Sequence, residues 1–261
     1  MIYAIIQARM GSTRLPGKVM MDLCDAPVIE HVVNRLNKSA LIDKIIIATS
    51  VDENNKPIID FCINNDISYF VGSEEDVLDR YYWAAIDNNV NDGDVIIRIT
   101  SDCPLIDPFI VDKVIEEHIS NKNDYTANVI ECTYPDGLDC EVFNFRVLKD
   151  AWINANLSSQ REHVTLYIRD NPDKFKLGNV KNDNDFSNLR WTLDEKEDFI
   201  FINEIYKNLF NKDSFFSMGD IIQLLNEKPE LSDINSKFTR NEGLLKSLKE
   251  DVDLGSGDVN K

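Results

Sequence analysis

The chain has 261 residues and a mass of 29.9 kDa, which is enough for one large α/β domain with a substantial core. Its 28 basic and 46 acidic residues give a formal net charge of −18. This charge disfavours binding to the phosphate backbone of nucleic acid and to anionic membrane surfaces. A polyanionic small substrate would therefore need a local cluster of basic side chains.

The cysteines and the apolar runs indicate the cellular setting. Five cysteines are scattered along the chain without any CxxC spacing, which disfavours a structural zinc site and a dense disulfide framework. The apolar run at the N-terminus is too short for a signal peptide. No stretch approaches the roughly 18 apolar residues of a membrane span. We therefore expect a cytoplasmic protein that does not associate with membranes.

Short runs rich in Ile and Val alternate with amphipathic segments in the first half. The runs are apolar on both faces, as buried parallel strands are. Strand–helix alternation of this kind predicts an α/β fold with a doubly wound, mostly parallel sheet. The predicted strands are residues 2–8, 44–50 and 94–100, and the predicted helices are 27–36, 56–65 and 75–86, with a further helix that opens at Asp107-Pro108 and runs to about His118.

The pattern becomes richer in strands after about Asn121. A turn at Pro135-Asp136-Gly137 separates two predicted strands, and Ser159 with Glu162 forms a plausible capping box for a helix that reaches Asn171. We expect one domain over residues 1–240 with an insert at about 121–180, followed by a polar C-terminal tail at 241–261. The strands expected here are 125–130, 138–145, 175–180 and 189–193, and the helices are 147–156, 159–171 and 195–210.

The loop after the first strand carries the clearest functional signal. Residues 8–18, ARMGSTRLPGK, hold two glycines together with Arg9, Arg14 and Lys18, and we expect Arg14 and Lys18 to lie on an exposed loop. Glycines let backbone N–H groups approach a phosphate closely, so the cluster predicts a triphosphate site at the carboxyl edge of the sheet. The alternative is a solvated loop whose basic residues pair with surface carboxylates. The spacing matches neither a P-loop nor a GxGxxG motif.

Several segments resemble a known family. Residues 5–19, IIQARMGSTRLPGKV, are similar to the signature of the SpsF-type cytidylyltransferases, which are named for spore-coat polysaccharide synthesis and are related to the sialic-acid and Kdo cytidylyltransferases. In the family, the stretch that corresponds to residues 193–198 is closer to VDTPED. Here Glu195 and Lys196 replace Thr-Pro, and Asp194 is kept. The resemblance implies a nucleotide-diphospho-sugar transferase-like fold with a strand-rich insert for dimerisation and acceptor binding. It continues in residues 72–81, 97–108, 137–143, 161–168 and 189–199.

Two aspartates are candidate magnesium ligands. Asp102 follows a predicted buried strand, and Asp194 follows another. The resemblance implies that both hold Mg²⁺, which takes one or two carboxylates together with phosphate oxygens and water. Alternatively, Asp102 shapes a turn before Pro104, and Asp194 caps the helix that follows with Glu197 three residues on. Asp198 is expected only to favour the dipole of that helix.

The remaining candidates bind the nucleotide and the acceptor. Asp79 and Arg80 would by default form salt bridges on a helix surface, but the resemblance places this segment near the nucleobase. Of the acceptor candidates, Arg161 has the donor geometry for a carboxylate or phosphate; Glu162 and His163 could instead be a capping residue and a helix-surface residue. We expect catalysis by Arg9, Arg14 and Lys18, acceptor binding by Glu141, Arg161 and His163, and CTP binding by Ala8, Arg9, Gly11, Ser12, Arg14, Lys18, Arg80 and Asp102.

These observations predict a magnesium-dependent cytidylyltransferase that acts as a homodimer. It would join CMP from CTP to a small acidic or sugar-like acceptor and release pyrophosphate, in surface polysaccharide or glycoconjugate synthesis. One alternative is a glycosyltransferase that uses a nucleotide sugar, although the DxD triplets of the chain lie in polar loops and the tail. Another is a non-catalytic nucleotide-binding subunit, which would have less need of Lys18, Asp102 and Asp194 together.

Overall fold

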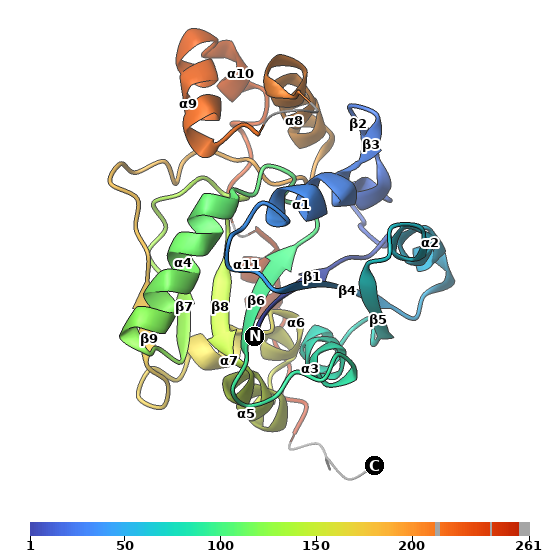
Figure 1. Ribbon diagram of the computed structural model, residues 1–261, viewed down its shortest axis with the longest axis vertical. Helices are drawn as coiled ribbons and strands as arrows, with labels where there is room; N and C mark the ends of the chain where they lie inside the picture. Colours follow the sequence, from blue (N-terminus) through green and yellow to red (C-terminus); the bar gives the residue numbers. More distant parts are fainter. Residues whose placement is uncertain (212–214, 241, 256–261) are drawn as a thin grey trace.

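A seven-stranded sheet forms the centre of the molecule (Figure 1). The structure is a computed structural model that describes residues 1–211, 215–240 and 242–255. The strand order is β5-β4-β1-β6-β8-β7-β9, and a separate hairpin pairs β2 with β3. The strands are β1 (Ile2–Gln7), β2 (Asp22–Leu23), β3 (Ala26–Pro27), β4 (Lys44–Ser50), β5 (Ser68–Gly72), β6 (Val95–Thr100), β7 (Tyr125–Ala127), β8 (Glu141–Asn144) and β9 (Leu177–Asn179).

The sheet is parallel except at one strand. β5, β4, β1 and β6 run parallel, β8 is antiparallel to both of its neighbours, and β7 pairs parallel with β9. The prediction of a mostly parallel α/β sheet is confirmed. Strands β7, β8 and β9, which come from the segment after Asn121, extend the same sheet as the first half of the chain.

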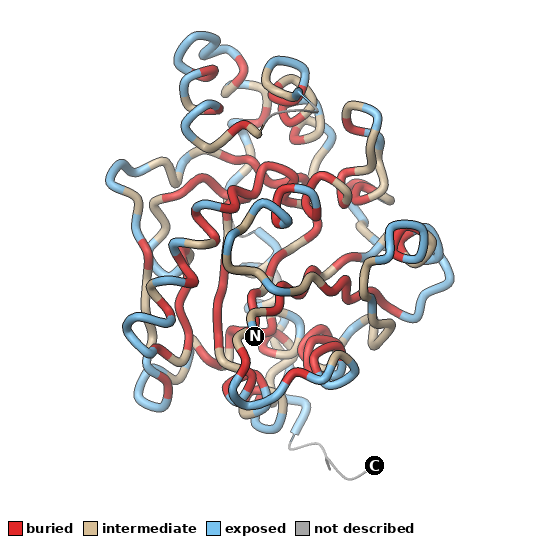
Figure 2. Tube along the Cα trace, viewed as in Figure 1, coloured by how far each residue is buried: buried red, intermediate tan, exposed pale blue. Residues whose placement is uncertain are grey.

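Successive residues of a strand point to opposite sides of the sheet. Because apolar residues occupy both sides, helices cover both faces. In β1, Ala4 and Ile6 join one apolar cluster, whereas Tyr3 and Ile5 join the other, and most residues of the central strands are buried (Figure 2). The helices are α1 (Val28–Leu36), α2 (Lys56–Asn64), α3 (Val77–Asp87), α4 (Pro108–Asn121), α5 (Phe145–Asn154), α6 (Ser158–Glu162), α7 (Leu166–Arg169), α8 (Lys196–Leu209), α9 (Met218–Glu227), α10 (Glu230–Asp233) and α11 (Glu242–Lys249), with 3-10 turns η1 (Lys18–Met20) and η2 (Glu53–Asn55).

The expected helix over residues 159–171 is wrong. Two short helices, α6 and α7, replace it because Val164 between them has a φ of 52°, in the left-handed region that a continuous helix excludes. The expected capping box is also absent. Asp251 instead accepts hydrogen bonds from the Ser159 backbone N–H at 2.9 Å and the Ser159 hydroxyl at 2.7 Å.

Two further expectations are corrected at the C-terminal side. Residues 189–193 form no strand and make only an isolated bridge between Arg190 and Asp136. The expected polar tail contains α11, which packs against α6; residues 256–261 of that tail lie outside the described residues. No helix of the described residues is long and apolar enough to cross a membrane.

Candidate active site

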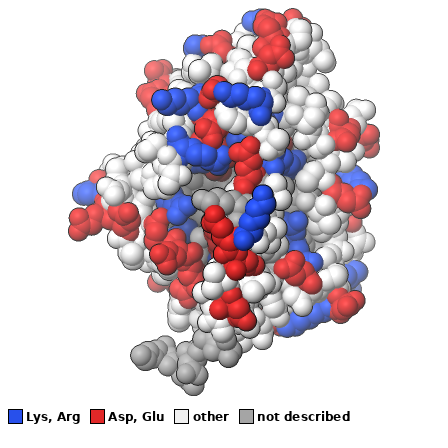
Figure 3. All heavy atoms as spheres, turned by 180° about the vertical axis from the view of Figure 1, so that it is seen from behind, with Lys and Arg blue, Asp and Glu red and all other residues white. Residues whose placement is uncertain are grey.

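A cavity of about 700 Å³ opens beside the carboxyl ends of β1 and β6. Acidic and basic side chains lie close together on the face of the molecule seen in Figure 3, which agrees with the mixed charges that line the cavity. Most of the predicted site residues meet here although they come from both halves of the chain. The predicted residues that line the cavity are Ala8, Arg9, Gly11, Ser12, Arg14, Lys18, Arg80, Asp102, Glu141, His163 and Asp194.

The loop after β1 folds back on itself before it reaches Lys18. The carbonyl of Met10 accepts hydrogen bonds from the N–H groups of Ser12 at 2.9 Å and Gly17 at 3.0 Å. Gly17 has a φ of 71°, which glycine adopts without strain. The turn then enters η1, which carries Lys18 into the interior with 8% of its surface exposed. The expectation that Lys18 lies on an exposed loop is therefore wrong.

Lys18 joins the two aspartates that were predicted to face a metal. Its Nζ lies 2.6 Å from Asp102 Oδ2 and 2.8 Å from Asp194 Oδ1. The two oxygens are therefore no farther apart than the sum of these distances. Burial acts to lower the pKa of Lys18, but the two carboxylates outweigh it and the net shift is upward. Lys18 correspondingly depresses the pKa of Asp102 against the opposing effect of burial.

The pair fits a magnesium ion that also takes oxygens from a substrate. Mg²⁺ binds oxygen at about 2.1 Å and needs only one or two carboxylates when phosphates and water complete its shell. Two converging carboxylates that line the cavity would supply that number. No group of three or more His, Cys, Asp or Glu in the described residues is arranged to hold a metal by itself, so Asp102 and Asp194 would need substrate oxygens or water to complete the shell of a magnesium ion.

Two arginines also form ion pairs with Asp194. Arg14 Nη2 lies 3.0 Å from its Oδ1, and Arg190 Nη2 lies 3.3 Å from its Oδ2. Asp194 is not the cap of α8, as one interpretation of the sequence required, because Glu195 is the N-cap residue and forms a capping box with Asp198. The carboxylate of Asp194 is thus directed toward the cationic side chains of the cavity.

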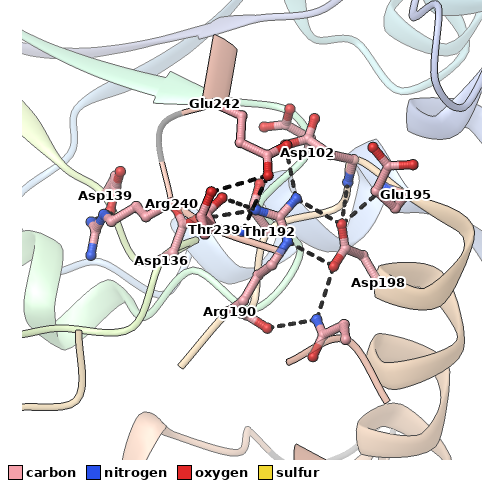
Figure 4. Close-up of polar contacts among 12 residues, drawn as sticks. Asp102, Asp136, Asp139, Arg190, Thr192, Glu195, Asp198, Thr239, Arg240 and Glu242 are labelled. Carbon is pink, nitrogen blue, oxygen red and sulfur yellow. Dashed lines mark hydrogen bonds and ion pairs between the residues drawn. The ribbon is translucent and has the colours of Figure 1, made fainter. Parts of the chain in front are cut away.

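Asp198 has a larger role than the sequence indicated. Its fully buried carboxylate accepts hydrogen bonds from Arg190 Nε and Nη2, both at 2.9 Å, and from the backbone N–H of Asp194 at 3.0 Å. Asn235 donates a further bond at 2.9 Å. Figure 4 shows Arg190 and Asp198 at the centre of this network. Because Arg190 lies outside any strand or helix, sequence periodicity gave no sign of it.

The outer end of the basic loop is more exposed. Arg9 forms an ion pair with Glu74 at 3.0 Å, and Glu74 also accepts a hydrogen bond from Ser50. Arg80 is buried rather than at the surface, and its Nη1 donates to the Ser73 carbonyl at 2.5 Å. The default interpretation of Arg80 as a surface salt-bridge residue is therefore wrong. Asp79 accepts a bond from the Trp152 indole at 2.8 Å.

Glu141 is a buried carboxylate that lines the cavity and organises the side chains around it. Its carboxylate forms an ion pair with Arg98 and accepts hydrogen bonds from Thr165 and from the Tyr125 hydroxyl, the last at 2.6 Å. Burial acts to raise its pKa, but Arg98 and the two hydroxyls depress it overall. Glu141 is thus occupied by protein groups, and it holds Arg98 in place at the cavity wall.

The structure does not place Arg161 in the cavity. Asp76 holds its guanidinium through Nε at 2.9 Å and Nη2 at 2.5 Å, and its Nη1 donates to the Trp152 carbonyl. Arg169, one residue beyond the segment matched to the family pattern, lines the cavity instead. Among the described residues Arg169 has no ion-pair partner. The break at Val164 separates the two arginines, so the expected continuous helix gave no reason to single out Arg169.

The turn at residues 135–139 contributes two carboxylates that the sequence analysis missed. Asp136 and Asp139 both line the cavity, and Arg240 forms an ion pair with Asp139. The turn lies tightly on residues 191–192, because a Cβ on Gly137 would lie 2.5 Å from the Trp191 carbonyl carbon and 2.6 Å from the Thr192 nitrogen. In the sequence analysis Asp136 was noted only as part of the turn Pro135-Asp136-Gly137, and Asp139 only as part of the resembling residues 137–143.

Comparison with known proteins identifies the family. A family model described as cytidylyltransferase matches residues 3–238. The chain belongs to the cytidylyltransferase family. The cavity of this cytidylyltransferase lies almost entirely within the matched region; Glu242, Gly243 and Leu244 of α11 are the lining residues beyond it.

Named relatives agree with this assignment. The spore coat polysaccharide biosynthesis protein SpsF of Bacillus subtilis is 37% identical over 236 residues, which cover 88% of this cytidylyltransferase and 95% of SpsF. A solved cytidylyltransferase from Leptospira borgpetersenii is 30% identical with a TM-score of 0.83, and the match covers 88% of this chain and 96% of that one. The 3-deoxy-manno-octulosonate cytidylyltransferase of Trichlorobacter lovleyi is 34% identical over 125 residues, 46% of each chain.

Proposed function

We propose that this protein transfers CMP from CTP to a sugar acid and releases pyrophosphate. The observation that carries the proposal is the contact of Lys18 with Asp102 and Asp194 inside a cavity bordered by the basic loop. Nucleotidyl transfer needs positive charge around a triphosphate and carboxylates for magnesium. The relatives named for spore-coat polysaccharide synthesis and for 3-deoxy-manno-octulosonate cytidylyl transfer support the nucleotide and the acceptor class.

In this proposal the main role of the protein is to place charged side chains around the phosphates of CTP. Arg14 and Lys18 lie where phosphate oxygens would be neutralised, and the glycine at position 11 keeps side-chain bulk away from the same wall. Asp102 and Asp194 would hold magnesium, which supplies charge neutralisation at the phosphates. The acceptor oxygen is the nucleophile, and pyrophosphate leaves from the opposite side of the α-phosphorus. No covalent protein intermediate is required.

The acceptor would bind at the end of the cavity where Arg98, His163 and Arg169 converge. In the described residues, neither Arg98 Nε nor His163 Nε2 has a hydrogen-bond partner, although both atoms are buried. Buried donors without partners are costly unless a ligand satisfies them. A carboxylate on the acceptor would accept hydrogen bonds from Arg98 Nε and from His163 Nε2 in the tautomer protonated there. It would lie beside Arg169, which has no ion-pair partner in the part of the chain that the structure describes.

The direct test is release of pyrophosphate in the presence of CTP and magnesium. The acceptors to compare are 3-deoxy-manno-octulosonate and N-acetylneuraminate, with an uncharged hexose as the control. We expect release only with an acidic sugar, and a CMP-sugar of the corresponding mass. Release of nucleotide diphosphate from a nucleotide sugar would support a glycosyltransferase instead. CTP binding without turnover of any acceptor would favour a non-catalytic subunit.

A homodimer and a cytoplasmic location remain predictions. The dimer was inferred from the resemblance of the strand-rich segment to the dimerisation lobe of related enzymes. Light scattering at micromolar concentration should give about twice the chain mass of 29.9 kDa. A single species at the chain mass would contradict it.

A further inference from the structure

We propose that Asp136 is the base that accepts the proton of the acceptor hydroxyl. The inference rests on the proposed cytidylyl transfer, since it assigns a residue to one step of that reaction. The acceptor O–H bond breaks as its oxygen forms a bond to the α-phosphorus of CTP; the proton passes to Asp136, and pyrophosphate departs with the electron pair of the broken P–O bond. Atoms and charge balance without a further reactant.

The hydrogen bonding of Asp136 separates it from four other carboxylates that line the cavity. Asp102 and Asp194 accept hydrogen bonds from Lys18, Asp139 accepts one from Arg240, and Glu141 accepts hydrogen bonds from two hydroxyls and from Arg98. Asp136 has 8% of its surface exposed, and among the described residues no group donates a hydrogen bond to its carboxylate. A buried carboxylate with open acceptor positions is suited to a donor that arrives with a ligand. The acceptor hydroxyl is such a donor.

The position of Asp136 agrees with this role. Arg190 Nη1 lies 3.5 Å from Asp136 Oδ2, while Nη2 of the same guanidinium lies 3.3 Å from Asp194 Oδ2. The guanidinium of Arg190 therefore links Asp136 to Asp194, whose carboxylate borders the proposed phosphate region. Figure 4 shows Asp136 with Arg190, Asp139 and Arg240. A hydroxyl bound to Asp136 would therefore lie close to the proposed phosphate region.

The surroundings also match the acidity that a base needs near neutral pH. Burial and the neighbouring Asp139 raise the pKa of Asp136 to about 7, although Arg240 and Arg190 act in the opposite direction. Arg240 is directed mainly to Asp139, and its Nε lies 4.0 Å from Asp136 Oδ1. Arg190 is directed mainly to Asp198. The two arginines thus orient Asp136 without forming close hydrogen bonds to it. General bases work best when their pKa lies near the working pH.

The test compares D136N with D139N, using 3-deoxy-manno-octulosonate as the acceptor. D136N keeps the shape of the side chain, so CTP affinity by calorimetry should stay within about twofold of wild type. We expect kcat to fall by about 10²-fold or more. D139N removes the charge that raises the pKa of Asp136, so the acidic limb of the kcat–pH profile should move to lower pH. A solely structural role for Asp136 would not predict this displacement.

Two outcomes would overturn the inference: a D136N enzyme with kcat within fivefold of wild type, or an acidic limb that is unchanged in both variants. Titration of the carboxyl carbons of the free protein by NMR adds a readout that needs no acceptor. A resonance that titrates near neutral pH should vanish in D136N, and its persistence would also reject Asp136. Wild-type protein that releases no pyrophosphate with any acidic sugar, while this resonance is present, would reject the proposed function instead.

Discussion

Two regions of the cavity wall, which we call the nucleotide end and the acceptor end after their proposed ligands, differ in how their charges are paired. At the nucleotide end, Lys18 and Arg14 contact carboxylates that line the cavity and are partly accessible to a ligand. At the acceptor end, the buried carboxylate of Glu141 accepts hydrogen bonds from two hydroxyls and forms an ion pair with Arg98. We expect the contacts of the first end to be exchanged for contacts with a triphosphate and a metal ion. Those of the second end fix the orientation of Arg98 whether or not a ligand is bound.

This difference shows that ion pairs in one cavity can serve opposite purposes. Mutations at the nucleotide end should change activity much more than stability. Mutations at Glu141 should change both, because a buried charge would lose its partner. The following variants test that distinction.

The largest effect is expected for D102N and D194N. Each removes a charge from the proposed magnesium site while preserving side-chain shape, and Asp194 is not the cap of α8. We expect turnover to fall by about 10³-fold, beyond the loss of a single donor, which costs about 10²-fold to 10³-fold. The melting temperature should change little. D60N, on the surface of α2, is the control. Near-normal turnover in both site variants would remove the basis for a shared metal.

Replacement of Lys18 by alanine should affect activity and ion dependence together. Loss of one positive donor costs about 3 kcal/mol in the transition state, so turnover should fall by about 10²-fold. The variant leaves Asp102 and Asp194 without the amine between them, and Mg²⁺ should therefore raise its melting temperature more than that of wild type. Exposed Lys149 provides the control K149A. An equal effect of Mg²⁺ on K18A and wild type would contradict the idea of exchangeable contacts.

Replacement of Glu141 by glutamine should destabilise the fold and weaken acceptor binding. Removing one partner of a buried pair costs about 3–5 kcal/mol, and KM for the acceptor should rise while CTP affinity stays unchanged. The folded-state pKa of Glu141 is depressed, so its contribution to stability is present above the unfolded-state pKa and is lost as pH falls through the folded-state value.

The check is a pair of denaturation series. The stability difference between wild type and E141Q should be full at neutral pH and should shrink below the ordinary glutamate range. A difference that is constant with pH would show that the charge of Glu141 contributes nothing to the native state.

The smallest effect is expected at the rim of the nucleotide end. Glu242 lies 3.5 Å from Arg14, and its side chain is 42% exposed, so the pair should contribute no more than about 1 kcal/mol. E242Q should change KM for CTP by less than about fivefold, with E250Q as an exposed control. A much larger change would mean that Arg14 is held as firmly as Arg98.

The same contrast explains how far the sequence could be interpreted. The nucleotide end was predictable because its basic residues follow one strand within a short loop, and because aspartates near strand ends gather at one sheet edge. Lys18 was nevertheless placed on the surface, since η1 was not foreseen. At the acceptor end, Arg161 was predicted and Arg169 was not singled out, because the left-handed residue Val164 has no signature in periodicity.

Helix boundaries set a second limit. Asp194 and Glu195 are adjacent, and both suit an N-cap position. Which of the two is the N-cap depends on Asp198, whose carboxylate accepts hydrogen bonds from the Glu195 N–H and from Arg190. Arg190 in turn meets Asp136, far away in the chain. Such a chain of contacts depends on tertiary packing, so local propensity does not reveal it.

Gly137 allows the turn at residues 135–139 to lie directly against the backbone of residues 191–192. Its φ of 107° and its contact with the backbone at residues 191–192 leave no room for a side chain. Alanine at this position would act as a spacer that pushes Asp136 away from Arg190 and Asp194, so the reacting oxygen and phosphorus would be held too far apart. Random mutagenesis should therefore recover almost no active substitutions at Gly137, although this residue offers no functional group to either substrate.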